Sequence, residues 1–249
     1  MDITLPTIVI LTSIFLLAGS VKGLIGVGLP TVALALLVNF MPLRDGAALM
    51  VLPAVLTNIW QASSGGRGLA LLRRFWLMLA MLCLATWVGV SILVASDERL
   101  MSGIFGVVLA LYAIVGLTRF EPRPLGRAEV WMSPLVGIAN GLVNGLTGSY
   151  VFPGVLYLEA LRLDRDAMIQ AMGILFLVAS SALAVSLTGH SVMTVKLFAL
   201  SAAAMLPALA GYYAGQYWRR KLPEALFRKV FLSGLLGLGI YTAATNFLR

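Results

Sequence analysis

Charged residues are scarce in this sequence. Asp, Glu, Lys and Arg make up 11% of the 249 residues, whereas soluble domains carry roughly 25%. So little charge cannot cover a water-facing surface, which excludes an ordinary soluble domain. One cysteine and one histidine exclude an internal disulfide and leave no metal-ligand cluster. No nucleotide-binding loop or nucleophile elbow is present either, so we expect no enzyme, no bound metal and no cofactor.

Apolar residues are abundant instead, at 60% of the chain with a mean hydropathy of +0.97. A membrane-spanning helix needs about 20 apolar residues. Runs of about this kind lie at 3–21, 24–42, 46–64, 75–96, 100–118, 129–146, 148–161, 167–188, 195–217 and 225–248. Isolated strands cannot satisfy their backbone in lipid, so each run should be helical. The sequence predicts an all-α integral membrane protein of about eight to ten membrane segments.

Basic residues alternate between the two sides of the predicted bundle. Most of the 18 lysines and arginines lie in the loops around 65–74, 119–128, 162–166 and 218–229. The other loops and the C-terminus hold only Arg44, Arg99, Lys196 and Arg249. The positive-inside rule therefore places the first group in the cytoplasm and both termini on the far side of the inner (cytoplasmic) membrane. The net charge of +8 thus serves as an orientation signal, and we expect no nucleic-acid partner.

A glycine-rich segment occurs twice. Residues 19–26, Gly-Ser-Val-Lys-Gly-Leu-Ile-Gly, match residues 141–148, Gly-Leu-Val-Asn-Gly-Leu-Thr-Gly, at five positions. Each half has a pair of apolar runs around this segment, followed by three further runs. Because five segments is an odd number, the second half must enter the membrane from the opposite side, as inverted-repeat transporters do. We predict a first repeat at 1–118, a cytoplasmic linker at 119–128 and a second repeat at 129–249, together forming one transmembrane domain.

The segment pairs around the two motifs have two alternative structures. They are either full crossings or re-entrant hairpins with the glycine turn at mid-depth. The second pair, at 129–161, is short for two crossings. Both structures return the chain to its starting side, so the predicted topology is the same.

The two motifs resemble the duplicated glycine-rich motif of TauE/SafE-type transporters. They read Gly23-Leu-Ile-Gly-Val-Gly-Leu-Pro30 and Gly145-Leu-Thr-Gly-Ser-Tyr-Val-Phe-Pro153, and the resemblance extends over nearly the whole chain. It implies a secondary transporter of a small organic or inorganic anion such as sulfite, a sulfonate or a related sulfur-containing anion. The sequence departs from the usual pattern where Leu29, Ser149 and Tyr150 stand in place of glycines. An anion channel and an auxiliary or structural subunit of a larger membrane complex remain alternatives.

Lys22 is the most informative charge because it lies inside the first motif, where the second half has Asn144. A lysine at membrane depth is costly and usually functional, which makes it a candidate counterion for an anion. The alternative is that its side chain extends to the interface. The motif glycines likewise have two interpretations, as turns around an anion or as small residues in helix packing.

Polar residues near the motifs and in the matching helices complete the candidate site. Interhelical hydrogen bonding is the competing explanation for each of them. The predicted substrate-binding residues are Lys22, Gly23, Gly26, Gly28, Asn58, Gln61, Asn140, Asn144, Gly145, Thr147, Gly148, Ser149, Tyr150 and Gln170. The expected partners are the small anion and the lipid bilayer. A coupling proton or sodium ion and a homodimer are left open.

Overall fold

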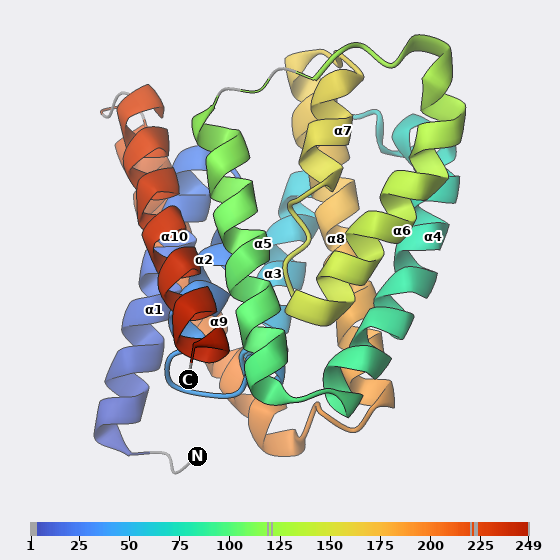
Figure 1. Cartoon of the computed structure of the whole chain (residues 1–249). Helices are drawn as coiled ribbons and strands as arrows, with labels where there is room; N and C mark the ends of the chain where they lie inside the picture. The colour runs from blue at the N-terminus through green and yellow to red at the C-terminus, as the bar shows by residue number, and fades with distance from the viewer. Residues whose placement is uncertain (1–3, 119, 121, 220, 222–223, 249) are drawn as a thin grey trace.

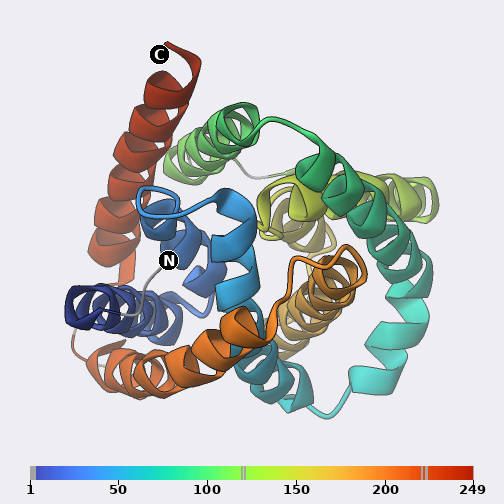
Figure 2. The same ribbon diagram turned by 90° about the horizontal axis from the view of Figure 1, so that it is seen from below.

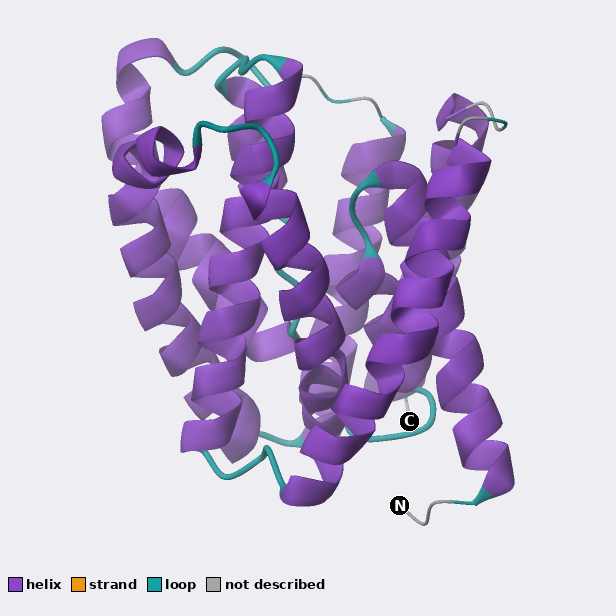
Figure 3. Ribbon diagram, turned by 180° about the vertical axis from the view of Figure 1, so that it is seen from behind, coloured by secondary structure: helices purple, strands orange, loops and turns teal. Residues whose placement is uncertain are grey.

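The computed structural model describes residues 4–118, 120, 122–219, 221 and 224–248. These residues form helices and loops, and no strand occurs among them (Figure 3). The predicted all-α membrane fold is confirmed. Arg119, Arg220 and Arg249, which belong to the charge pattern, lie outside the described residues.

Ten α-helices and one short 3-10 helix make up the described part of the chain. In order they are α1 (Leu5–Ile25), α2 (Leu29–Leu37), α3 (Leu43–Ser63), α4 (Gly68–Ala95), α5 (Glu98–Leu117), η1 (Gly126–Ala128), α6 (Glu129–Thr147), α7 (Gly154–Ala160), α8 (Arg165–Gly189), α9 (Val195–Arg219) and α10 (Glu224–Phe247). Seven of them, α1, α3, α4, α5, α8, α9 and α10, are long and apolar enough to cross a membrane.

The short helices α2 and α7 decide between full crossings and interrupted pairs. At 1.5 Å per residue, the 9 residues of α2 and the 7 residues of α7 are far shorter than a bilayer core of about 30 Å. Each pair is therefore one long helix, a break, and a short helix that leads back. In Figure 1, α1 begins at the end of the bundle where α10 finishes, whereas α6 begins at the opposite end.

The arginine-rich loops share one end of the bundle. Figure 1 shows the α3–α4, α5–α6 and α7–α8 connections together at the top, with the start of α1 and the finish of α10 at the bottom. We call the end with these three connections the basic end. Seen along the bundle in Figure 2, the short α2 lies inside a ring of longer helices. All but one of its residues are buried.

Helix pairing is the same when the two halves are exchanged. The main pairs are α1 with α9, α4 with α6, α5 with α10 and α3 with α8, followed by α4 with α8 and α3 with α9. Replacing each helix of the first half by its counterpart in the second half, and the reverse, returns the same set. These contacts support the inverted duplication, which stays a prediction.

Close backbone contacts at glycine hold α1 to α9 and α4 to α6. A Cβ added at Gly19 would overlap the carbonyl oxygen of Ala208, and one at Gly141 would overlap that of Leu82. Gly19 and Gly141 are matched positions of the repeated segment. Small residues allow helices in lipid to approach in this way, which favours dispersion contacts.

We predict that Gly19→Ala destabilises the protein, because the added methyl group meets backbone that cannot move without separating α1 from α9. Overpacking of this kind costs about 1–3 kcal/mol. The measurement is the midpoint of thermal unfolding in detergent. Gly234→Ala in α10 is the matched control, since nothing lies within 4 Å of its added Cβ. Equal losses in both variants would contradict the packing explanation.

Candidate functional site

Two helix ends inside the bundle define the centre of the molecule. α1 ends at Gly26, whose N–H donates to the carbonyl oxygen of Lys22 at 2.7 Å. α6 ends at Gly148, whose N–H donates to that of Asn144 at 2.7 Å. Both glycines are left-handed, with φ of 88° and 70°, a conformation that glycine adopts without strain. The two motifs therefore form the same C-cap at matched positions.

The predicted motif glycines separate into two groups. Gly26, Gly28 and Gly148 lie at the breaks with positive φ. Gly23 and Gly145 lie within α1 and α6, where an added Cβ would overlap the carbonyl oxygens of Tyr212 and Thr86. The first group thus forms turns and the second forms helix contacts.

Lys22 is the only charged residue among the buried residues of the described chain. Its side chain does not extend to the interface, because the residue is 2% exposed. Its Nζ donates to Thr57 Oγ1 at 2.9 Å and to Asn58 Oδ1, both on α3. No carboxylate of a described residue forms an ion pair with it. The ammonium is therefore held by neutral oxygens alone.

Asn58 connects Lys22 to the second half of the chain. Its Nδ2 donates to the hydroxyl of Tyr150 at 3.3 Å and to Ser180 Oγ at 3.4 Å. We call Lys22, Thr57, Asn58, Tyr150 and Ser180 the Lys22 cluster. It joins α1, α3, the break at 148–153 and α8. All five residues are at most 3% exposed.

The break that carries Tyr150 is fixed by local hydrogen bonds. Asn140 on α6 donates through Nδ2 to the carbonyl oxygen of Tyr150 at 3.2 Å. Its Oδ1 accepts the N–H of Gly154, the first residue of α7, at 3.0 Å. Thr147 Oγ1 accepts the N–H of Ser149 at 3.2 Å. Asn140 and Thr147 thus position the break and do not contact Lys22.

Asn144, the counterpart of Lys22, has different partners. Its Nδ2 donates to Thr86 Oγ1 at 3.1 Å and to the carbonyl oxygen of Ala179 at 2.9 Å. Its Oδ1 is buried and has no partner among the described residues. Ala179 directly precedes Ser180, so the Lys22 cluster and Asn144 contact adjacent residues of α8.

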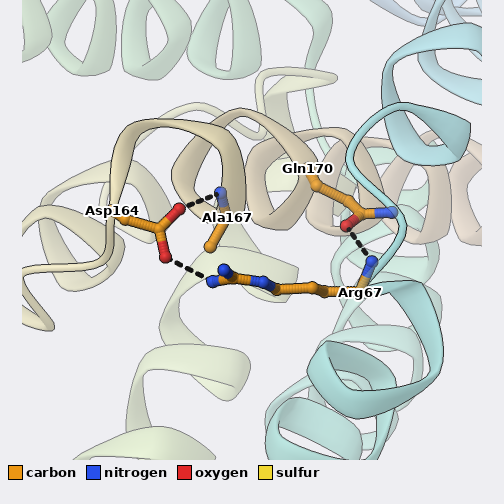
Figure 4. Close-up of polar contacts among 4 residues, drawn as sticks. All are labelled: Arg67, Asp164, Ala167 and Gln170. Atoms are coloured by element: carbon orange, nitrogen blue, oxygen red, sulfur yellow. Dashed lines mark hydrogen bonds and ion pairs between the residues drawn. The ribbon is translucent and has the colours of Figure 1, made fainter.

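Gln61 and Gln170 join α3 to α8 at the basic end and form no hydrogen bond to the Lys22 cluster. Gln61 Nε2 donates to the carbonyl oxygen of Ile169 at 3.3 Å, and Gln170 Nε2 donates to that of Ala62 at 2.9 Å. Gln170 Oε1 also accepts the N–H of Arg67 at 2.9 Å, as Figure 4 shows. Their role in substrate binding stays a prediction.

Arg67 extends this junction to the loop before α8. Its guanidinium donates to Asp164 (Figure 4). Asp164 also caps α8, because its carboxylate accepts the N–H of Ala167 at 3.0 Å. This ion pair and the two glutamine bridges hold the two halves together at the basic end.

A cavity of about 340 Å³ reaches both breaks. Ile25 and Val27 of the first break and Val151 and Phe152 of the second lie in its wall. The remaining wall comes from α5, α7, α8, α10 and Phe120, and it includes two charged residues, Glu159 and Arg228. Lys22 does not line it. Tyr150 directly precedes Val151, so the cavity and the Lys22 cluster meet at the second break.

A family model for the sulfite exporter TauE/SafE matches residues 11–242. The chain belongs to the TauE/SafE family. The resemblance seen in the two motifs is thereby confirmed, and so is the expectation of a multi-pass membrane protein with a transport function. Neither the curated proteins nor the solved structures contain a match to the chain.

Thr57, Thr86 and Phe176 were not among the site residues predicted for this TauE/SafE chain. Thr57 accepts from Lys22, Thr86 accepts from Asn144, and the ring of Phe176 lies 5.4 Å from that of Tyr150. Thr57 directly precedes the predicted residue Asn58 in an apolar run. This adjacency is a sequence signal by which Thr57 could be found. Thr86 and Phe176 become relevant only through the pairing of α4 with α6 and through the path of the second break.

We predict that Asp164 makes stability depend on pH in the acid range. The N–H of Ala167 first, and Arg67 second, hold the pKa of the Asp164 carboxyl below its ordinary value of 3.8. The folded state therefore favours the ionised form. Its contribution is complete above the unfolded pKa and is lost as the pH falls through the lowered folded pKa.

Thermal unfolding measured from pH 6 downward should test this. The wild-type midpoint should fall more steeply below about pH 4 than that of Asp164→Asn, which lacks the titrating group. Both side chains of the pair are largely exposed, so the difference should be small. Identical pH profiles for the two proteins would show that Asp164 makes no such contribution.

Proposed function

We propose that this protein is a secondary transporter that moves a small anion across the cytoplasmic membrane by alternating access. The observation that carries the proposal is the buried Lys22 ammonium, which has no carboxylate partner among the described residues. A charge in a membrane interior is costly and is retained where it serves transport. A small anion, for example sulfite or a sulfonate, supplies the missing charge.

The surroundings of Lys22 suit a site that is empty between transport events. Thr57 and Asn58 solvate the ammonium in place of water. Neutral oxygens reduce the cost of burial but do not cancel the charge. An anion therefore gains more from Lys22 than from any other described residue in the core.

We assign the cavity at the two breaks as the access route from one side. The basic end is the cytoplasmic end by the positive-inside rule, which places both termini outside. Glu159 and Arg228 in the cavity wall lie on α7 and α10, close to the basic loops of the sequence. Lys22 does not line the cavity. This supports a carrier, whose cycle includes a closed step, and not a continuously open channel.

No ATP-binding motif occurs in the sequence,, which supports secondary transport. The interrupted helix pairs support it as well, since broken helices near the midplane form the substrate sites of many secondary transporters. A proton and a sodium ion are the two alternatives for the coupling ion.

Lys22→Gln should abolish anion binding and transport while the protein stays folded. Glutamine retains a hydrogen-bond donor but lacks the charge. The measurement is a thermal-shift screen of the purified protein with sulfite, sulfate, small sulfonates and carboxylates, followed by uptake into proteoliposomes. The control is Lys229→Gln, which removes an exposed lysine of α10 and should leave both properties unchanged.

Three results would contradict parts of the proposal. Unchanged anion binding in Lys22→Gln would show that Lys22 is not the counterion of the anion. Stabilisation by a cation or a neutral solute, and by no anion, would show that the substrate is not an anion. Flux that never runs against the anion gradient, whatever proton or sodium gradient is applied, identifies a channel.

A further inference from the structure

We infer that the Lys22 site selects monovalent over divalent anions, an inference that rests on the proposed function. It follows from the number of charges and the number of unused donors in the Lys22 cluster. The buried part of the described chain holds one charged group, and its counterpart in the second half is the neutral Asn144. A site with one positive charge is neutralised by one negative charge.

Lys22 offers one unused donor. Protonated Lys22 has three N–H groups, and two of them donate to Thr57 and Asn58. Lys22 has no other hydrogen bond among the described residues, so its third N–H is available to an anion.

Tyr150 offers the second unused donor. Its hydroxyl oxygen accepts from Asn58, and its O–H has no acceptor among the described residues. The other two hydroxyls of the cluster are committed to backbone, since Thr57 donates to the carbonyl oxygen of Pro53 at 2.8 Å and Ser180 to that of Phe176 at 2.7 Å. Asn58 contacts both Lys22 and Tyr150, so the two free donors flank one side chain, and we assign both to the same small anion.

A divalent anion leaves this site with an uncompensated negative charge. The C-terminal end of α1 at Gly26 and the unpartnered Oδ1 of Asn144 add negative partial charge, and the N-termini of the short helices α2 and α7 offer partial positive charge only. Removing an uncompensated charge from water costs more than a single ammonium returns. A divalent anion therefore binds more weakly than a monovalent anion of the same shape.

Methanesulfonate and sulfate form the matched pair of probes, because both are tetrahedral sulfur oxyanions and they differ by one unit of charge. Dissociation constants for purified protein are measured by calorimetry at neutral pH and equal ionic strength. We expect methanesulfonate to bind at least about tenfold more tightly than sulfate. Tyr150→Phe, which removes only the hydroxyl, should weaken both anions while preserving their ratio. Lys22→Gln should bind neither.

The outcomes separate the two proposals. If sulfate binds as tightly as methanesulfonate or more tightly, the selectivity for monovalent anions is overturned while the anion transporter stands. If neither anion binds, and no other small anion stabilises the protein, the proposed function fails and this inference fails with it. If Tyr150→Phe changes the ratio instead of both affinities alike, the assignment of its hydroxyl as a charge-independent donor is wrong.

Discussion

A backbone amide in lipid must find its partner inside the protein, and this constraint governs the centre of the molecule. α1 and α6 both end within the bundle, where water cannot satisfy their last carbonyl groups. Gly26 and Gly148 turn left-handed, and their N–H groups satisfy one carbonyl oxygen each, those of Lys22 and Asn144. These caps permit two interrupted helix pairs in a membrane protein, and a cavity reaches both interruptions.

The surrounding helices make the interruptions tolerable. Close glycine contacts join α1 to α9 and α6 to α4, while Asn140 fixes both ends of the second break. The Lys22 cluster draws its hydrogen bonds from both halves, with Asn58 as the connection. The Lys22 cluster is therefore a product of the tertiary structure, because no single half contains all of its members.

The amino-acid sequence predicts the fold well and the site in part. Apolar runs of membrane-spanning length alternate along the chain with short loops that carry the basic residues. The long helices and the basic end therefore follow from local composition. The sequence predicts Lys22 as a site residue, because a charge inside an apolar motif has few explanations. The sequence could not distinguish Gly23 from Gly26, since both fit a packed helix and a turn until the helix end is known. Nor could it separate Asn58 from Gln61, whose different partners depend on how α3 lies against α8.

The glycine contacts between helices of different halves also bear on biosynthesis. α1 leaves the ribosome long before its partner α9. The glycine face of α1 therefore lacks its partner until α9 is made, whereas α6 meets α4, which precedes it in the chain, soon after its own synthesis. Contacts as distant in sequence as those of α1 with α9 form late. The first half cannot assemble as a finished unit ahead of the second, and the pair of α1 and α2 gains its permanent neighbour α9 only late in translation.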